Sequence, residues 1–362
     1  MSVKPYKLLI VGAGLTAAVT SALIKQCLPG RNIEIHVWEK SRGIGGRMNS
    51  HRSSSGGRVD LGAQYITRSS QYAEKHKRFF DDLIRNDVLK PLPGMIEGAT
   101  IEQNNEDFMA PNGINSVVKY FFSSSDAKIK LNTFCREINL TCQNKETSKH
   151  VWTVTTKDGN SEEFNGVILT IPVPQILQLN GTFQDVLKNY QSELQQVEYS
   201  SRYALALFFP EDTKLNVSWI AKYVKDNPCI RFVSLDSVKR GFDSSTSGLS
   251  ILIHTSVPFG LANLESDIGE VENIIYQHFQ ELFPSLPPPT STRCIRWRYS
   301  QVYKSYPGQP GALDVSTKPL LVLAGDCFVH SNFSGCVESA NAVLKILQKE
   351  LKSSNTCQSS NI

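Results

Sequence analysis

The chain has 362 residues, of which 40% are hydrophobic and 20% charged, values typical of a globular protein with about two domains. The formal net charge of +4 comes without a Lys/Arg block of the kind that binds nucleic acid. No apolar run reaches the ~18 residues of a membrane span. We therefore expect neither a nucleic-acid partner nor insertion into a membrane.

The first residues have the pattern of a nucleotide-binding turn. An apolar strand over Tyr6–Val11 leads into Gly12, where only a glycine lets the chain turn tightly. Gly14 has no side chain, so the backbone can approach a pyrophosphate, and Ala17 is small enough for a helix to pack on the strand. The helix expected from Thr16 presents its positive N-terminus to phosphate groups. The alternative is an ordinary βαβ unit with a glycine turn.

The next strand and loop extend this pattern. We expect a strand over Ile33–Glu39, and Glu39 follows Gly14 at close to the ~20-residue spacing of dinucleotide-binding folds. Its carboxylate can accept hydrogen bonds from a ribose diol, or it only caps the strand end. In the loop that follows, Gly46 lets backbone amides approach a phosphate, and Arg47 can clamp that phosphate with its fork of donors.

The middle of the chain is predicted to pass between two domains. Apolar periodicity, alternation and proline positions predict further elements there. In chain order these are a helix over 71–89, a helix over Ile114–Phe122, strands over Val151–Thr156 and Val167–Ile171, strands over Tyr203–Phe209, Ile230–Leu235 and Leu249–Val257, and a helix over Glu265–Phe283. The last three strands predict a second sheet, and the last helix is expected to cover its outer face.

The C-terminal part contains a strand that ends in Gly325-Asp326 and a helix that opens at Ser334-Gly335. The apolar residues of this helix recur at steps of three and four, which indicates one buried face. They are Val337, Ala340, Leu344, Leu347 and Leu351.

The glycine turn, the Gly-Gly-Arg loop and the distal strand–Gly–Asp–helix together resemble FAD proteins of the amine oxidase and hydroxylase type. In such proteins the late acid, here Asp326, holds the ribityl chain, and the last helix directs its N-terminus at the flavin edge that becomes negative on reduction. The resemblance implies an α/β fold with a Rossmann-like FAD-binding domain, interleaved with a smaller α+β substrate domain as in p-hydroxybenzoate hydroxylase. We expect noncovalent FAD, with Cys336 a packed thiol and not a flavin tether.

The resemblance also implies particular residues and boundaries. The residues expected to contact FAD are Gly12, Gly14, Thr16, Ala17, Glu39, Gly46, Arg47, Gln64, Tyr65, Cys135, Asp326 and Gly335. The FAD-binding domain is expected over residues 1–70, 109–180 and 308–352, the substrate domain over 71–108 and 181–307, and a disordered polar tail over 353–362.

A narrower resemblance, to the renalase family, rests on several segments in the expected order. They are Asp60–Thr67, Ala110–Ile114, Leu169–Leu179, Tyr199–Phe208, Asn227–Ser234, Ile253–Gly260 and Ser331–Cys336. Cys327 and Cys135 depart from the family pattern, although contacts made by the backbone survive such changes. The resemblance implies an FAD-dependent oxidase that takes 2-dihydro and 6-dihydro isomers of NAD(P) and molecular oxygen, and releases NAD(P)⁺ and hydrogen peroxide.

The expected chemistry requires little acid–base catalysis, because a dihydropyridine is itself a strong hydride donor and positioning does most of the work. The substrate is expected between the second sheet and the flavin. Tyr65, His254, Trp297 and Tyr299 are candidates for contact with the nicotinamide, and Arg231 and Arg298 for contact with its phosphates. The alternatives are core packing for the aromatic residues and, for Arg202 and Arg231, ion pairs with acids on their own sheet.

Two other functions remain open from the sequence. A monoamine oxidase would place two aromatic rings by the flavin, one just upstream of the last helix, and the chain offers Phe328 and Phe333 there instead of the expected tyrosine. A secreted signalling ligand without catalysis is the second. The N-terminal run after Lys4 and Lys7 imitates a secretory signal but forms the expected FAD strand and helix, so a cytosolic location is favoured over secretion. Oligomeric state and the choice between NAD and NADP forms are not predicted.

Overall fold

The computed structural model describes residues 4–54, 56–100, 104–144, 149–241 and 248–356. The chain divides into two compact units, each made of separate stretches of sequence. The first unit comprises residues 1–46, 118–198 and 302–362, and the second comprises 47–117 and 199–301.

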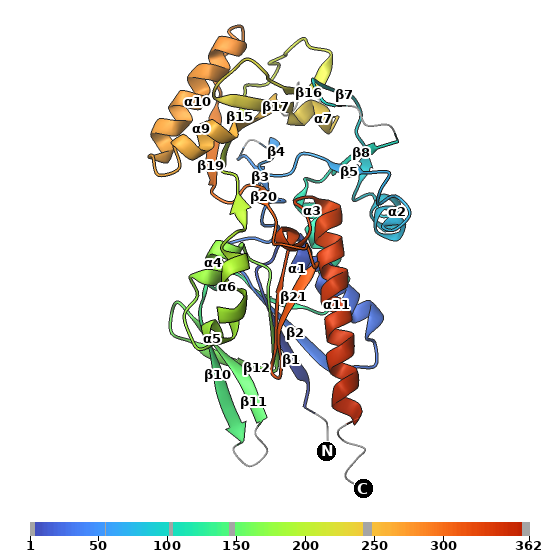
Figure 1. Cartoon of the computed structure of the whole chain (residues 1–362). Coiled ribbons are helices and arrows are strands. Elements are labelled where there is room, and N and C mark those ends of the chain that lie inside the picture. Colours follow the sequence, from blue (N-terminus) through green and yellow to red (C-terminus); the bar gives the residue numbers. More distant parts are fainter. Residues whose placement is uncertain (1–3, 55, 101–103, 145–148, 242–247, 357–362) are drawn as a thin grey trace. The chain divides into compact units, whose positions relative to one another are not determined.

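The first unit contains a six-stranded sheet of order β21-β22-β13-β1-β2-β9, in which only the β21–β22 pair is antiparallel (Figure 1). Its elements are β1 (Tyr6–Val11), α1 (Leu15–Cys27), β2 (Ile33–Trp38), β9 (Lys128–Lys130), β10 (Cys135–Asn144), β11 (Lys149–Thr156), β12 (Ser161–Phe164), β13 (Gly166–Leu169), α4 (Val173–Leu177), α5 (Phe183–Leu187), η1 (Lys188–Tyr190), α6 (Gln191–Leu194), β20 (Val302–Lys304), β21 (Ala312–Thr317), β22 (Leu320–Ala324), η2 (Asp326–Phe328) and α11 (Phe333–Thr356).

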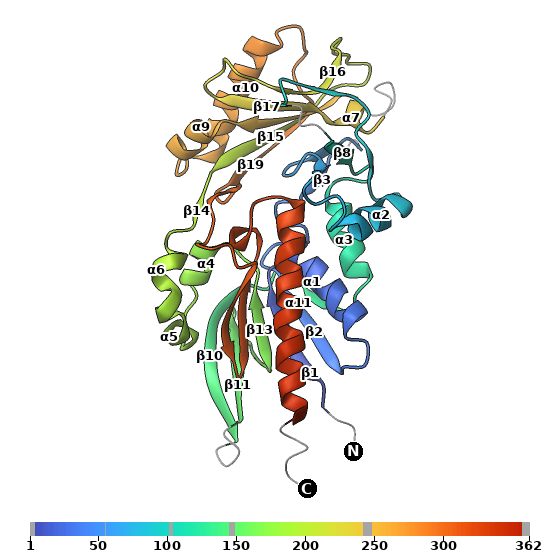
Figure 2. The ribbon, with the colours of Figure 1, turned by 45° about the vertical axis from the view of Figure 1, so that its right-hand side comes forward.

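Helices α1 and α11 lie side by side against this sheet (Figure 2). The apolar face predicted for α11 is confirmed, because Val337, Ala340 and Leu347 are fully buried and Leu344 and Leu351 nearly so. A three-stranded antiparallel sheet, β10-β11-β12, packs on β2 through Phe164, whose ring meets Trp38 edge-on at 5.6 Å. Strands β1 and β2 pair in parallel and α1 connects them, so the expected βαβ unit is present.

The second unit is built on a mainly antiparallel sheet of order β19-β15-β18-β17-β16-β7. Its elements are β3 (Ser50–Arg52), β4 (Arg58–Asp60), β5 (Ile66–Arg68), α2 (Lys77–Arg85), β6 (Lys90–Pro91), β7 (Met95–Glu97), β8 (Glu106–Met109), β15 (Arg202–Phe208), β16 (Trp219–Tyr223), β17 (Ile230–Leu235), α7 (Asp236–Lys239), β18 (Ser250–Thr255), α9 (Val257–Ala262), α10 (Ile268–Leu282) and β19 (Ser291–Trp297). Helix α3 (Asn115–Ser123) and strand β14 (Glu198–Tyr199) span the boundaries between the units.

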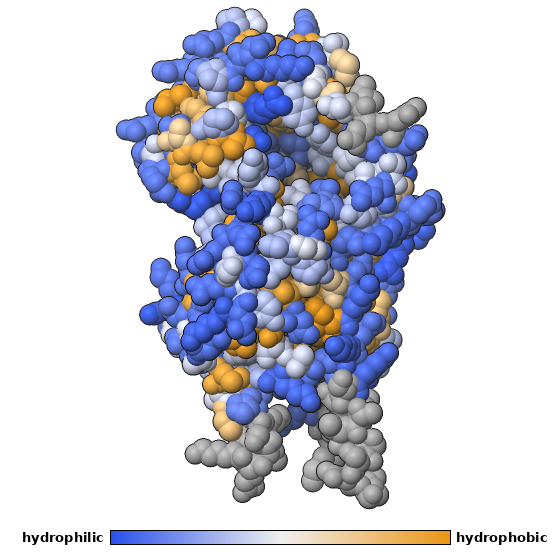
Figure 3. Space-filling view, viewed as in Figure 1, coloured by the Kyte–Doolittle hydropathy of each residue, from blue (hydrophilic) through white to orange (hydrophobic). Residues whose placement is uncertain are grey.

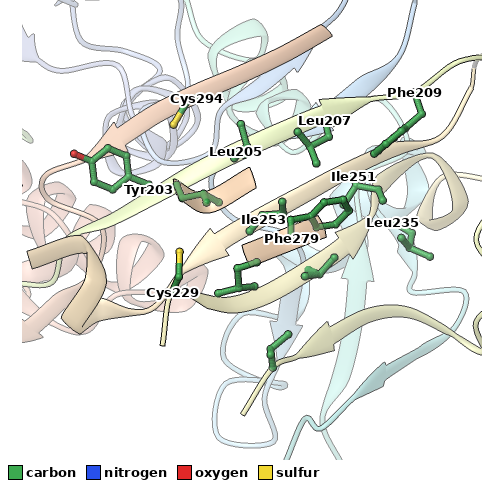
Figure 4. Close-up of a cluster of buried hydrophobic side chains, with 14 of the residues drawn as sticks. Tyr203, Leu205, Leu207, Phe209, Cys229, Leu235, Ile251, Ile253, Phe279 and Cys294 are labelled. Atoms are coloured by element: carbon green, nitrogen blue, oxygen red, sulfur yellow. The ribbon is translucent and has the colours of Figure 1, made fainter. Parts of the chain in front are cut away.

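Alternation along the strands gives this sheet two different faces. One face carries Leu205, Leu207 and Ile253, which pack against α10 residues such as Phe279 (Figure 4). The other face carries Ala204, Ala206, Phe208 and Leu252, which pack against Val59 and Leu61 of the β4 segment. The prediction that the helix near 265–283 covers one face of the sheet is confirmed.

The helical layer leaves some apolar surface exposed. In Figure 3, apolar side chains gather over α9 and the adjoining end of α10. Leu261 is 51% exposed and Ile268 40% exposed there. Within the described residues, no helix is both long and apolar enough to span a bilayer.

Some predicted elements differ from the observed ones. The helix expected over 71–89 is shorter, because residues 71–76 form turns before α2. The strand expected over Leu249–Val257 ends at Thr255, and α9 follows, since Ser256 Oγ accepts a hydrogen bond from the Phe259 amide. The serine N-cap followed by a proline in the first helical turn could have predicted this helix from the sequence.

The observed units also differ from the expected domain boundaries. Residues 47–70 and 109–117, expected with the FAD domain, lie in the second unit because β4 packs on β18 and α7. Residues 181–198 lie in the first unit, where Thr182 exchanges hydrogen bonds with the β10 strand. Of the tail expected to be disordered, residues 353–356 continue helix α11, and residues 357–362 lie outside the described residues.

Candidate functional site

The carboxyl ends of β1, β2, β13 and β22 meet at one edge of the parallel sheet, where open α/β sheets bind ligands. Gly12 follows β1 with a φ of +99°, a conformation that side chains rarely adopt. A Cβ there would lie 3.0 Å from both Ile171 Cγ2 and Thr170 Oγ1. Glycine at the tight turn expected at position 12 is thus required both by the backbone conformation and by Thr170 and Ile171, which follow β13.

Gly14 is the N-cap residue of α1, and the space beside it is open. A Cβ at Gly14 would meet no atom within 4 Å, and the first turn of the helix carries no acidic residue. The first amides of a helix lack partners within it and attract anions. Ala17 is fully buried and Thr16 nearly so, as expected for the packed side of this helix.

Glu39 follows the last residue of β2 and is buried. Its Oε2 accepts a hydrogen bond of 2.9 Å from the Ala13 amide, and its Oε1 accepts one of 2.8 Å from the Ser41 amide. The carboxylate therefore already stabilises the glycine turn. Each oxygen keeps a lone pair that could accept a further bond from a ribose hydroxyl.

The Gly-Gly-Arg loop lies directly on the glycine turn. The Gly45 amide donates to the Ala13 carbonyl over 2.9 Å, and a Cβ on Gly46 would be 3.5 Å from Gly14 Cα. Arg47 follows in sequence. The structure thus brings together two glycine loops that the sequence predicted to approach the same phosphates.

The late acid lies at the same edge of the sheet. Asp326 follows β22 directly after Gly325, is buried, and accepts a hydrogen bond of 2.6 Å from Ser331 Oγ. A Cβ at Gly325 would be 3.9 Å from the Thr170 carbonyl, the residue that also borders Gly12. Asp326 therefore lies at the same edge of the sheet as Gly12.

Helix α11 begins close behind this acid. The Gly335 amide donates to Asn332 Oδ1 over 2.8 Å, which caps the helix, and a Cβ at Gly335 would lie 1.9 Å from the His330 carbonyl oxygen. Only glycine fits there. The helix carries no acidic residue in its first turn.

Cys135 begins β10 next to the acidic strand end. The Thr133 amide donates to the Glu39 carbonyl over 2.8 Å, which holds this segment beside Glu39. Burial raises the pKa of the Cys135 thiol to about 12, so the thiol stays neutral. Its backbone could still border an adenine.

These residues fit a dinucleotide cofactor. The edge combines open space beside Gly14, an N-terminus of α1 without an acidic residue in its first turn, and carboxylates just after β2 and β22. The glycine loops and α1 could hold the phosphates, Glu39 a ribose, and Asp326 a polyol chain.

Gln64 lies in the second unit, and its side chain is committed to that unit. Its Nε2 donates to the Asp60 and Gly62 carbonyls, and its Oε1 accepts from Lys239 Nζ over 3.3 Å. Both amide hydrogens are used. Any contact of Gln64 with a cofactor would therefore be made by the second lone pair of its Oε1 or by its backbone.

Two of the expected pocket residues lie near one end of the second sheet, His254 on β18 and Trp297 at the end of β19. His254 Nε2 and Trp297 Nε1 bond to the same Leu61 carbonyl, over 3.0 and 2.9 Å. Because a carbonyl only accepts, Nε2 of His254 carries the proton. Burial lowers the pKa of His254 to about 4, so its ring is neutral at physiological pH.

Tyr65 pairs with a residue that the sequence did not single out. Its hydroxyl lies 3.0 Å from the Tyr223 hydroxyl, and burial together with this bond raises the pKa of Tyr65 above its ordinary value. Tyr65 therefore stays protonated. Tyr223 on β16 was missed because neither its strand nor its neighbours stood out in the sequence.

The other candidates have different surroundings. Tyr299 packs edge-on against Tyr199, with ring centroids 5.4 Å apart. Arg298 forms a two-pronged ion pair with Glu265, over 2.7 and 2.9 Å. The guanidinium of Arg298 therefore already binds a carboxylate. It was expected to bind a substrate phosphate.

Arg231 lies above the Tyr223 ring, 5.5 Å from its centroid. The alternative that Arg202 and Arg231 pair with acids on their sheet is not observed, since neither forms an ion pair with an Asp or Glu of the described residues. From the sequence, Arg202 was expected only to pair with an acid. Without that pair, it becomes a candidate for contact with phosphate. The described residues also contain no group of His, Cys, Asp or Glu arranged to hold a metal ion.

Comparison with known proteins agrees with this geometry. A model of NAD(P)-binding Rossmann-like domains matches residues 10–83, and a model of flavin-containing amine oxidoreductases matches residues 71–343. Renalase from Mus musculus is 41% identical over 346 residues, which cover 95% of this chain and 99% of the mouse protein.

Two solved structures share the fold. A proposed protoporphyrinogen oxidase from Exiguobacterium has a TM-score of 0.69 at 14% identity, over 97% of this chain and all of that one. A protein from Pyrococcus furiosus has a TM-score of 0.59 at 14% identity, over 94% of this chain and 97% of its own. The fold predicted from the sequence, a Rossmann-like domain interleaved with a second α+β domain, is confirmed, and the chain belongs to the renalase family of FAD-dependent oxidoreductases.

Proposed function

We propose that this flavin oxidoreductase oxidises the 2-dihydro and 6-dihydro isomers of NAD(P), with molecular oxygen as the acceptor. The products are NAD(P)⁺ and hydrogen peroxide, one of each per donor and oxygen consumed. The observation that carries the proposal is the 41% identity to mouse renalase along nearly the whole of both chains.

The chemistry of the second unit supports this assignment. Bound FAD supplies the hydride acceptor and the route to oxygen. Two of the residues expected to contact the nicotinamide are uncharged: His254 is neutral and donates a hydrogen bond to the Leu61 carbonyl, and Tyr65 is protonated. A dihydropyridine needs no base to release hydride, so neutral groups that orient the ring suffice. Trp297, tied to the same Leu61 carbonyl, holds an aromatic surface in a fixed place.

Amine oxidation is the competing function, because the amine oxidoreductase model also matches the chain. The two aromatic residues near the last helix give it little support. Phe328 is fully buried against Tyr306, with ring centroids 5.3 Å apart, and Phe333 is 7% exposed. Neither ring is available to flank an amine.

Anaerobic reduction of the flavin, followed by loss of its visible absorbance, tests the proposal. We expect 2-dihydro or 6-dihydro NAD(P) to bleach the flavin at least tenfold faster than ordinary 4-dihydro NAD(P)H, because a pose that directs carbon 2 or 6 at the acceptor does not direct carbon 4 there. In air, peroxide should equal the donor oxidised. Faster bleaching by catecholamines or other amines would move the chain to the amine oxidase function.

We further propose that Glu39 binds the adenosine ribose of noncovalent FAD. A charge-assisted hydrogen bond contributes ~1.5–3 kcal/mol, so Glu39→Ala should weaken FAD by roughly 10- to 150-fold. The measurement is titration of acid-prepared apoprotein with FAD, and flavin that stays with the acid pellet would contradict noncovalent binding. Glu34→Ala is the matched control, since Glu34 lies at the other end of the same strand and pairs with Lys128.

The competing role of Glu39 is purely structural, because it already holds the Ala13 and Ser41 amides. Unchanged FAD affinity together with a lower melting temperature of the Glu39→Ala apoprotein would support that role.

A further inference from the structure

Two arginines of the second unit lie at neighbouring strand ends. Arg202 is the first residue of β15, and its Nη1 donates to the carbonyl of Thr255, the last residue of β18, over 2.9 Å. Thr255 is in register with Ile230 of β17, the residue before Arg231. Arg202 therefore reaches across the end of β18 towards the strand that carries Arg231.

Arg231 is placed by an irregularity in its strand. Ile230 pairs with Thr255 and Phe232 with His254, so β17 has one residue more than β18 at this point, and that residue is Arg231. Such bulges redirect side chains and are frequent near functional sites. The Arg231 guanidinium lies over the Tyr223 ring, and its one hydrogen bond to the described residues is a long one of 3.4 Å to the Val224 carbonyl.

Within the part of the chain that the structure describes, these two guanidinium groups have no acidic counter-ion, in contrast to other arginines of the unit. Arg298 is paired with Glu265, Arg240 with Asp236, and Arg68 with Glu106. Arg202 and Arg231 have no carboxylate partner among the described residues. Burial, and then the positive charge of Arg231, holds the pKa of Arg202 below its usual range, which indicates that the two cations repel each other.

Aromatic and hydroxyl groups border this pair. The Tyr223 ring packs against Phe232 with centroids 5.0 Å apart, and Phe232 stacks on His254 at 6.1 Å. The paired hydroxyls of Tyr65 and Tyr223 lie beside them. A cationic fork next to flat rings suits a nucleotide, whose phosphates match guanidinium geometry and whose rings can stack.

We propose that Arg202 and Arg231 together bind the pyrophosphate of the dinucleotide substrate. This inference rests on the proposed function and extends it, because it makes the pyrophosphate, and not only the dihydronicotinamide ring, a determinant of which substrates are accepted. A doubly charged diphosphate would neutralise the pair and accept hydrogen bonds from donors that have no acidic partner among the described residues.

The test compares a donor that carries the pyrophosphate with one that lacks any phosphate. Anaerobic flavin reduction is measured in a stopped-flow instrument with the 2-dihydro isomer of NAD and with the 2-dihydro isomer of nicotinamide riboside. The concentration dependence of the rate gives Kd, and its plateau gives the limiting rate. Arg202→Met and Arg231→Met should each raise Kd for the dinucleotide by roughly 10- to 150-fold, the range for a lost charge-assisted bond. Kd for the riboside should rise less than about threefold on the same basis.

The matched control is Arg293→Met, which removes the same charge from an exposed position on β19 of the same sheet. Its Kd for the dinucleotide should change less than about threefold, as for surface substitutions in general. Inorganic pyrophosphate should compete with the dinucleotide in the wild-type enzyme and bind at least tenfold more weakly to both site variants. If Arg202→Met does not fold, two other variants serve in its place. They are Arg231→Met, at an exposed position, and Arg202→Lys, which keeps the charge.

Equal losses for riboside and dinucleotide, or unchanged pyrophosphate binding in the site variants, would overturn the inference. If neither donor reduces the wild-type flavin, the proposed function fails instead. The pyrophosphate titration then still decides whether the two arginines form an anion site.

Discussion

Arg240→Met should lower the free energy of unfolding by about 3–5 kcal/mol, because it removes one partner from a buried ionic cluster. The cluster consists of Asp60, Asp236, Lys239 and Arg240, all of which are nearly or completely buried. Arg240 bonds to Asp236 over 2.9 Å and to Asp60, and Lys239 bonds to Asp236 over 2.8 Å. Without Arg240, two buried carboxylates would share one cation.

The cluster also fixes segments that the sequence singled out for other reasons. Asp60 Oδ1 accepts from the Ile114 amide over 2.8 Å and from Ser50 Oγ over 2.7 Å. Lys239 Nζ donates to the carbonyl of Gln64 over 3.2 Å. Loss of Arg240 should therefore weaken the hydrogen bonds that hold the segments around Ser50, Gln64 and Ile114.

Urea unfolding at saturating FAD, followed by circular dichroism, measures the effect. Lys222→Met is the control, since Lys222 forms an ion pair with Glu97 at the surface and such pairs contribute at most about 1 kcal/mol. A loss below about 1 kcal/mol for Arg240→Met would show that the carboxylates do not depend on this cation.

The same experiment has a predicted pH dependence. Burial alone would raise the pKa of Asp236, but the charges of Lys239 and Arg240 outweigh it and hold that pKa well below its ordinary value. A depressed carboxyl pKa stabilises the fold above the unfolded value of about 4 and loses this contribution as the pH falls below it. The difference between wild type and Arg240→Met should therefore shrink below about pH 4.

The parts that could be predicted from the sequence are those governed by neighbours in the chain. The strand over Tyr6–Val11 is observed with the predicted bounds, because an apolar run that ends at a glycine turn contains its own limits. Strand Ile230–Leu235 was also predicted with its observed bounds, from the alternation of its side chains, although the bulge at Arg231 was not. The positions of the glycine loops and of Glu39 and Asp326 after strand ends were also predicted, since their spacing is local or follows a strand end, while their contacts with a cofactor stay a prediction.

The parts that could not be predicted depend on contacts between distant residues. The Gln64 amide is occupied by Lys239, and Arg298 by Glu265, partners that no local pattern reveals. The ionic cluster joins Asp60 to Arg240 across most of the second unit's sequence. The sequence could not distinguish Arg202 from an arginine in a surface ion pair, because its partner, the Thr255 carbonyl, lies on another strand.

Gly335→Ala should destabilise the chain by about 3 kcal/mol, at the upper end of the usual cost of overpacking, and should weaken FAD binding as well. The added methyl group would lie 1.9 Å from the His330 carbonyl oxygen, and a backbone atom cannot rotate away. Either the first turn of α11 or the segment before it must move. That segment includes Ser331, whose hydroxyl donates to Asp326, so the movement would displace the carboxylate that we propose holds the ribityl chain.

The control for this variant is Gly30→Ala, at an exposed glycine where a Cβ would meet no atom within 4 Å. Alanine there should be neutral or slightly stabilising, since it only restricts the unfolded chain. The melting temperature of the apoprotein and its affinity for FAD are measured for both variants. Because the displaced segment holds Asp326 through Ser331, the loss of FAD affinity should exceed tenfold, the equivalent of ~1.4 kcal/mol. A Gly335→Ala protein that is less stable but binds FAD as tightly as wild type would separate the helix start from the cofactor site, and would contradict the role proposed for Asp326.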